Sequence, residues 1–174
     1  MNSRSSRNSP LHLSETGQIM NGPVIGYAKS YDTAAVNSML NTPQVRMLLP
    51  RDVKLMWGVK PIDPAETTYE LYAIKANTRD GKAPLDGSAV ADAKGDFAEQ
   101  GSAAEVSMTM TPTGAKTWAR MTADNIGEFI AIVLDGYVYS APRVNSEIPN
   151  GRSSISGQFT IQEAKDLAKR AEVR

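Results

Sequence analysis

The strongest local signal in this 174-residue chain is a two-residue turn between two apolar segments. Asp135-Gly136 separates residues 129–134 (Phe-Ile-Ala-Ile-Val-Leu) from residues 137–141 (Tyr-Val-Tyr-Ser-Ala). Asp-Gly suits a type I′ turn, whose two central residues have positive φ angles and whose twist matches that of paired strands. The pattern therefore predicts a β-hairpin, and it assigns Asp135 to turn chemistry rather than to catalysis.

The segments around this hairpin carry signals of both strands and helices. Residues 105–111 alternate apolar and small polar side chains, as a half-buried strand does. Pro112 opens a helix whose inward face includes Trp118 and Ile126, and the helix is expected to end at a left-handed Gly127. Residues 152–156 predict a further strand, and a capping box at residues 160–163 begins a last helix. This order predicts an α+β fold, an antiparallel sheet with helices packed on one face as a two-layer sandwich.

The first half of the chain carries weaker signals. One helix is predicted after Asp32, and a second after Thr42-Pro43, with Leu48 among its inward-facing residues. The alternating segments 52–60 and 68–77 predict two strands that pair antiparallel.

The length of the chain points to one domain, or to one domain with an extension. Residues 1–17 are rich in serine and follow neither the helical nor the strand period, so we expect a tail that is disordered or foreign to the fold. Residues 18–174 would then form the folded domain.

Composition excludes several classes of function. The 19 Lys and Arg balance the 19 Asp and Glu, which argues against a nucleic-acid partner. The chain has no cysteine, and its one histidine, His12, lies in the predicted tail, so thiol catalysis, histidine catalysis and cysteine–histidine metal sites are all disfavoured. No glycine-rich nucleotide motif occurs. We therefore expect no catalytic residue, no cofactor and no metal.

Two weaker chemical interpretations remain open. Ser153 or Ser154 with Asp135 would make a small hydrolase, although small polar residues on an exposed strand explain these serines better. Asp92 and Asp96 would share one face if their segment were helical, and a solvated face is the favoured alternative.

Two features indicate protein contact. Tyr137 and Tyr139 are expected to share one face of a hairpin strand, and tyrosine is enriched at interfaces. An unpaired sheet edge could also accept an extended chain. The longest apolar run, residues 129–134, is too short to span a bilayer, and the start of the chain lacks the apolar core of a secretory signal.

A long ordered string of motifs covers about residues 83 to 169. The motifs are Leu85-Asp86-Gly87 with Val90 and Asp92-Ala93, then Asp124 to Gly127, Ile130 to Gly136, Ser140 to Pro142, Glu147-Ile148, Asn150 to Arg152, Ile155 to Thr160, and Glu163-Ala164 to Leu167-Ala168. This string resembles the head portion of the first periplasmic domain of SecD, the membrane-anchored accessory subunit of the bacterial Sec translocase. Residues 22–77 resemble, more loosely, the Bacteroidetes-type SecDF fusion.

The resemblance implies a non-enzymatic domain on the periplasmic side of the inner membrane. Such a domain would engage unfolded preprotein in the late, proton-driven steps of export, and it would meet SecF and the SecYEG channel through the full-length protein. Transmembrane helices outside this chain would attach it to the membrane. The alternative is a purely structural domain that docks or spaces other Sec subunits.

The resemblance also assigns structural roles to a set of motif residues and suggests a fragment. The motif residues are Asn125, Gly127, Asp135, Gly136, Ser140, Ala141, Pro142, Gly151 and Gly157. Asn150-Gly151 stands where the family often has Gly-Gly. The chain stops at Arg174, before the Leu-rich stretch and the strand with which the family continues, so we expect an excised piece that lacks a final strand.

Overall fold

The computed structural model describes residues 22–63, 65, 67–76, 83–97, 104–157, 162 and 172–173. The chain divides into two compact units, Met1–Ile74 and Lys75–Arg174, and each is described by itself. The predicted tail with His12 and the predicted last helix, apart from Gln162, lie outside the described residues.

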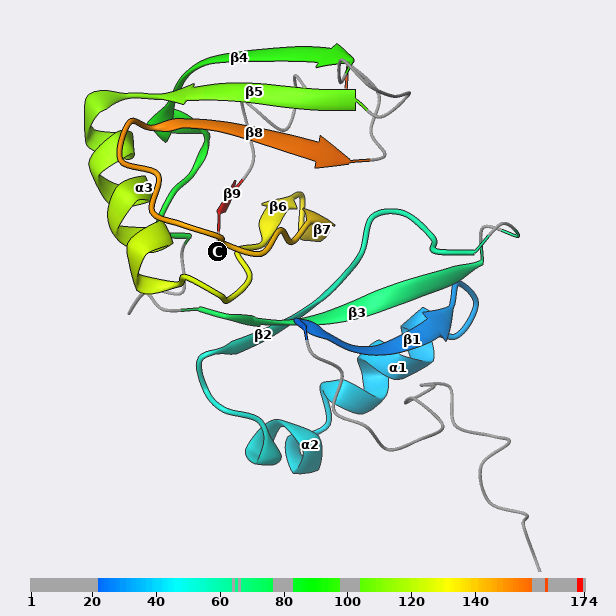
Figure 1. The fold of residues 1–174 in the computed structure, drawn as a ribbon. Coiled ribbons are helices and arrows are strands. Elements are labelled where there is room, and N and C mark those ends of the chain that lie inside the picture. Colours follow the sequence, from blue (N-terminus) through cyan, green and yellow to red (C-terminus); the bar gives the residue numbers. More distant parts are fainter. Residues whose placement is uncertain are drawn as a thin grey trace, which may run out of the picture. The chain divides into compact units, whose positions relative to one another are not determined.

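The first unit combines a three-stranded sheet with two short helices (Figure 1). Its elements are β1 (Val24–Lys29), α1 (Thr33–Leu40), α2 (Pro43–Leu48), β2 (Val53–Trp57) and β3 (Thr68–Lys75). β3 is central, between β1 and β2, and β1 runs antiparallel to it. The Gly58 N–H donates to the Glu70 carbonyl (2.8 Å) and the Ile62 N–H to the Thr68 carbonyl (2.9 Å), so the chain after β2 also runs antiparallel to β3. The predicted antiparallel pair is confirmed.

The core of the first unit lies between α1 and the sheet. Ala28, Val36, Trp57 and Leu71 form one buried cluster. The Trp57 indole N–H donates to the Asn37 side-chain oxygen over 2.8 Å, so the buried ring keeps a hydrogen bond while it joins strand to helix.

The predicted inward position of Leu48 is wrong, because its side chain is 84% exposed. α2 has only six residues, and Val45 within it and Leu49 directly after it are half-buried. So short a helix buries only a narrow row of apolar side chains, and Leu48 lies outside that row.

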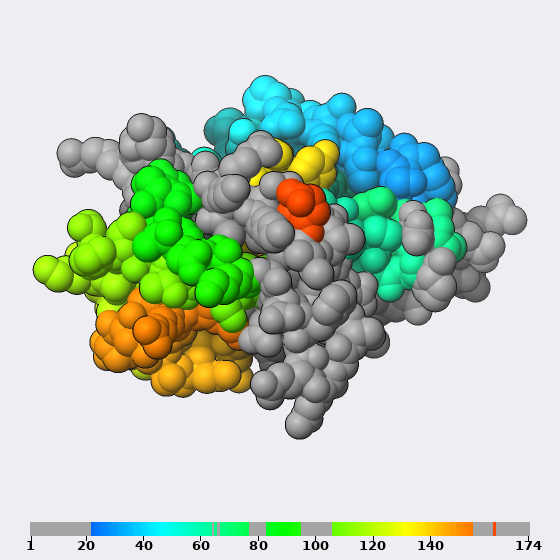
Figure 2. Space-filling model, turned by 90° about the horizontal axis from the view of Figure 1, so that it is seen from above, coloured from blue at the N-terminus to red at the C-terminus, as the bar shows by residue number. Residues whose placement is uncertain are grey.

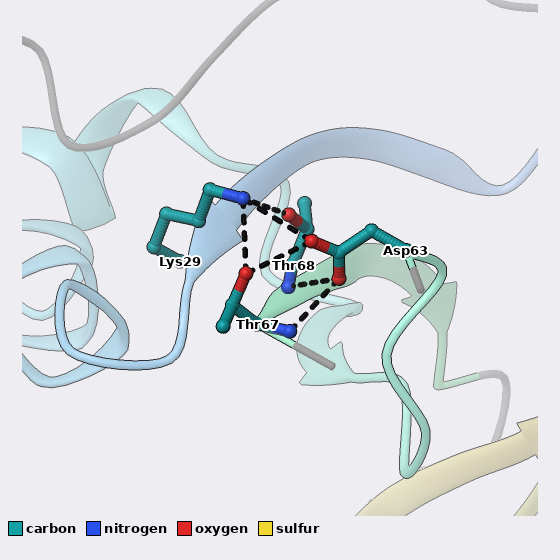
Figure 3. A network of polar contacts seen from close by, with 4 residues as sticks. All are labelled: Lys29, Asp63, Thr67 and Thr68. Atoms are coloured by element: carbon teal, nitrogen blue, oxygen red, sulfur yellow. Dashed lines mark hydrogen bonds and ion pairs between the residues drawn. The ribbon is translucent and has the colours of Figure 1, made fainter. Parts of the chain in front are cut away.

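A polar network closes the loop between β2 and β3 (Figure 3). One Asp63 carboxylate oxygen accepts the N–H groups of Thr67 (2.8 Å) and Thr68 (2.7 Å). The other oxygen accepts the Thr67 hydroxyl (2.9 Å) and the Lys29 ammonium (3.3 Å). These donors, led by the Thr68 N–H, hold the pKa of Asp63 well below its usual range, because each of them favours the ionised carboxylate.

The second unit contains six strands, one α-helix and one 3₁₀ turn among its described residues (Figure 1). They are η1 (Gly87–Ala89), β4 (Val90–Phe97), β5 (Ala104–Met110), α3 (Pro112–Asp124), β6 (Ile132–Leu134), β7 (Tyr137–Ser140), β8 (Arg152–Gly157) and β9 (Glu172–Val173). One sheet has the order β4-β5-β8 and the other β7-β6-β9, and every pairing in them is antiparallel. The α+β class with antiparallel pairing is confirmed, and the described strands are divided among three small sheets.

Turn geometry in the second unit follows the sequence. Asp135 and Gly136 have φ angles of 52° and 83°, and Leu134 pairs with Tyr137 on either side, so the predicted hairpin turn is confirmed. Gly127 has the predicted positive φ, 88°. α3 ends at Asp124, however, so Ile126 lies in the turn beyond the helix and is 56% exposed instead of facing inward.

Candidate functional site

The second unit encloses a cavity of about 320 Å³. One wall is mainly apolar. It is formed by Met108 and Met110 of β5, Trp118 and Thr122 of α3, Ile130 just before β6, and Ile132, the first residue of β6. The other wall is formed by residues 142–146 and Ile148, which follow β7, and by Arg152, Ser153 and Ser154 of β8. In Figure 2, β8 and the segment before it, in orange, lie at the surface beside the yellow-green residues of β5 and α3.

Strand alternation places the lining residues. Met108 and Met110 are two apart on β5 and therefore point to the same side of the sheet. Met108 belongs to one buried cluster, with Ile132, and Met110 to a second, with Trp118. The cavity therefore lies where the two clusters of the second unit meet.

Two buried polar side chains tie the walls together. The Trp118 indole N–H donates to the Ser153 hydroxyl oxygen over 2.7 Å. The Thr122 hydroxyl, only 1% exposed, donates to the Trp118 carbonyl (2.9 Å) and accepts the Ile148 N–H (2.9 Å). α3 is thus bonded both to β8 and to the segment before it, so the cavity is held open by the fold itself.

The lining offers no acid and no base among the described residues. It contains neither aspartate, glutamate, histidine nor lysine. Activation of a serine hydroxyl needs an adjacent base, and Asp135 sits in the hairpin turn and is not a lining residue. This arrangement gives Ser153 a packing role beside Trp118 and gives no support to the hydrolase interpretation.

The charged lining residues are two arginines. Arg143 donates from Nε to the Gly127 carbonyl over 2.7 Å, and its side chain is otherwise exposed. Arg152 is also exposed. Within the described part of the chain, neither guanidinium forms an ion pair. The cavity therefore has an apolar interior and a positively charged rim.

The two tyrosines predicted to contact a polypeptide occupy different environments. Tyr137 is 49% exposed. Tyr139 is half-buried and packs against the cluster that includes Met108 and Leu134. Neither lines the cavity, and Tyr137 is the ring that the fold presents at the surface.

The motif residues lie mainly in turns and strand ends. The Asn125 side-chain amide donates to the Met121 carbonyl (2.8 Å) at the end of α3, and the Gly127 N–H donates to the Val144 carbonyl (2.8 Å). Ser140 pairs with Ile132, Ala141 follows β7, Gly157 pairs with Ala104, and Pro142 lines the cavity. Gly151 has a φ of 64° and directly precedes β8.

Asp92 and Asp96 lie in strand β4, so they do not share a helical face. Four strand residues span roughly 13 Å, which is too far for one acid–base pair. Across the described residues, no group of three or more His, Cys, Asp or Glu side chains could hold a metal ion. None of the described helices is both long and apolar enough to cross a membrane.

Fold and cavity define a small α+β domain with an apolar, arginine-rimmed cavity and no acid or base in its described lining. The family model for the SecDF P1 head subdomain matches residues 67–170. The chain belongs to this family.

Curated relatives extend the match beyond that segment. The chain is 42% identical over 146 residues to the protein translocase subunit SecD of Rhodothermus marinus, an alignment that covers 84% of this chain and 23% of that protein. It is 43% identical over 84 residues to the protein translocase subunit SecDF of Thermus thermophilus, which covers 48% of this chain and 11% of that protein. The chain therefore spans less than a quarter of the length of either relative.

A solved structure of SecDF, described as a membrane component that enhances protein export, is 30% identical and matches 81% of this chain and 59% of its own. The TM-score of 0.45 is too low to define a common arrangement of the whole chain.

Proposed function

We propose that this chain is the periplasmic head domain of a SecD-type translocase subunit and that it engages unfolded preprotein during late steps of export. The observation that carries this proposal is the apolar cavity of about 320 Å³ in a domain of the SecDF P1 head family. An unfolded chain offers no fixed shape or sequence, so a site that accepts apolar side chains of different kinds suits it. Met108 and Met110 supply flexible, polarisable walls of this kind.

The size of the cavity predicts weak, reversible contact. At about 320 Å³ it lies near the lower end of ligand pockets, which are roughly 300–1,000 Å³, and it has room for one or two side chains of a passing segment. Each buried large apolar side chain contributes about 1.5–3 kcal/mol. Association itself costs about 4–15 kcal/mol in lost freedom, so the net affinity is low and a bound segment can leave again. Repeated weak capture is compatible with a chain that must keep moving.

The remaining parts of the proposal concern the whole protein. Transmembrane segments elsewhere in the full-length subunit would attach the domain to the inner membrane, and those segments would carry the contacts with SecF and SecYEG. Residues 18–174 would form the periplasmic portion, with residues 1–17 outside the fold. The domain would act through contact and not through catalysis.

Site-specific crosslinking in the full-length subunit tests this proposal. A photoreactive residue at Ser146, which lines the cavity, is expected to capture a stalled secretory preprotein. The same residue at Met47, which is 85% exposed on α2 in the other unit, is the matched control and is expected to capture little. A second position at Tyr137 tests the predicted tyrosine surface.

Crosslinks from Ser146 to Sec subunits alone would contradict preprotein binding and favour the docking or spacer alternative. The hydrolase interpretation has its own check: Ser154→Ala should leave export near the wild-type rate, because no described lining residue can act as a base for its hydroxyl.

A further inference from the structure

We propose that the cavity of the second unit selects segments in which an apolar residue is adjacent to an aspartate or glutamate, and that Arg143 and Arg152 make this selection. This inference rests on the proposed function, because it assumes that the cavity receives an extended polypeptide. It concerns which segments the cavity prefers.

Charge distribution is the first support. The whole chain is neutral, with 19 basic and 19 acidic residues, but the described cavity lining holds two arginines and no acidic residue. Glu147 lies between the lining residues Ser146 and Ile148, and Glu128 lies two positions before Ile130, but neither glutamate lines the cavity. The rim therefore carries a local positive charge that the composition as a whole conceals.

Availability of the guanidinium groups is the second support. Arg143 uses Nε to bond the Gly127 carbonyl, which anchors the group and leaves its terminal nitrogens for another acceptor. Both arginine side chains are exposed, and neither has an ion-pair partner among the described residues. A guanidinium presents its N–H donors in a planar fork that matches a carboxylate, so these groups suit an acidic side chain better than any other common peptide group.

The position of the arginines allows one ligand to satisfy both the preference for an apolar side chain and the preference for a carboxylate. The arginines line the same cavity as Met110, Trp118 and Ile130. An extended segment that places an apolar side chain in the cavity carries its neighbouring residues past the rim, because successive residues are only about 3.3 Å apart. The ligand is therefore an extended peptide with an apolar residue and an adjacent carboxylate.

Peptide binding to the intact 174-residue chain tests the inference. Three fluorescent 12-residue peptides share one central Leu-Phe pair and differ only in the flanking residues, which are Asp, Asn or Lys. Fluorescence anisotropy at low salt is expected to give the order Asp, then Asn, then Lys, with about three- to tenfold between the first and the last, the range expected of partly exposed ion pairs. Sodium chloride at about 0.3 M should reduce this difference, because it screens exposed charges.

Variants identify the groups responsible. The double variant Arg143→Gln, Arg152→Gln is expected to bind the three peptides alike, whereas Arg46→Gln, an exposed arginine on α2, should keep the wild-type order. Circular dichroism verifies that each variant is folded. Equal binding of all three peptides by the wild-type chain would overturn the charge preference and leave the cavity as a site for unfolded chain. A preference that survives in the double variant would overturn the assignment to these arginines, and binding of none of the peptides would count against the proposed function itself.

Discussion

The substitution Gly151→Ala tests whether the wall of the cavity depends on close approach between the turn before β8 and helix α3. A Cβ atom at Gly151 would lie 2.6 Å from the Ala115 Cβ and 3.1 Å from the Met110 Cβ. Real carbon atoms do not approach to 2.6 Å, so the turn or α3 has to move. Gly151 also has a positive φ of 64°, which an alanine adopts with strain.

The expected magnitude has two parts. Overpacking of a well-packed site costs about 1–3 kcal/mol. A left-handed conformation of a residue with a Cβ costs about 1–2 kcal/mol. Gly151→Ala should therefore lower the free energy of unfolding by about 2–5 kcal/mol, a large share of the roughly 5–15 kcal/mol that stabilises a typical domain.

Gly136→Ala is the matched control. Gly136 has a φ of 83°, and a Cβ there would meet nothing within 4 Å. This variant isolates the cost of the backbone conformation, and its expected loss is about 1–2 kcal/mol. The difference between the two variants measures the steric contribution, which urea unfolding followed by circular dichroism can resolve.

Ala115→Gly in the Gly151→Ala background completes the test, because it removes the atom that the new methyl group would meet. Ala115→Gly alone should cost about 1 kcal/mol in helix propensity, yet in the double variant it should recover stability. Equal losses for Gly151→Ala and Gly136→Ala, with no recovery, would refute the reasoning about close approach.

Four further substitutions probe other parts of the fold. Thr122→Val removes the hydroxyl that accepts the Ile148 N–H, and the unsatisfied donor should lower the free energy of unfolding by about 1–3 kcal/mol in urea titrations. Leu48→Ala should change stability by less than about 0.5 kcal/mol because the side chain is 84% exposed, whereas Leu71→Ala, at a side chain that is 1% exposed, should cost about 2–5 kcal/mol. Asp63→Asn should destabilise the first unit at neutral pH. Because the pKa of Asp63 is lowered in the fold, the ionised carboxylate stabilises the folded state above the unfolded pKa of about 4. In thermal unfolding scans, the stability difference between the variant and wild type should therefore shrink as the pH falls below about 4.

Local signals predicted the elements whose pattern is set by nearby residues. Asp135-Gly136 fixed the hairpin because the turn chemistry is contained in two residues. The alternation of Val106, Met108 and Met110 predicted three side chains that are all buried in the structure. Gly127 has the predicted positive φ, since a left-handed residue has few alternatives to glycine, although α3 ends three residues earlier, at Asp124.

Local sequence patterns gave wrong predictions where burial depends on contacts with residues distant in the sequence. Leu48 has the same local pattern as a buried helical leucine, but its exposure depends on how much of α2 reaches the sheet. Ile126 was assigned to a helical face that stops two residues earlier, at Asp124. The strand of Asp92 was not recognised, because a segment of alanine, lysine and glycine has neither period clearly.

The candidate site could not be read from the sequence because it is built from segments that only the tertiary fold brings together. Met108 and Ile130 are more than 20 positions apart, and Arg143 and Arg152 flank a turn that shows no signal of a shared site. One weak clue was available: Trp118 on a helical face needs a partner for its indole N–H when it is buried. That partner, Ser153, belongs to the serine-rich strand that instead suggested a nucleophile.

The contacts that build the cavity also limit what it can do. Trp118 is fixed by Ser153, and Thr122 by Ile148, so the walls are already ordered before any ligand arrives. A preformed site loses little conformational entropy on binding, and this partly offsets the small apolar area that a cavity of about 320 Å³ can bury. Selectivity must then come from groups at the exposed rim, and the guanidinium groups of Arg143 and Arg152 are such groups. The apolar cavity would thus give similar affinity to many side chains, while the charged rim would discriminate among their neighbours.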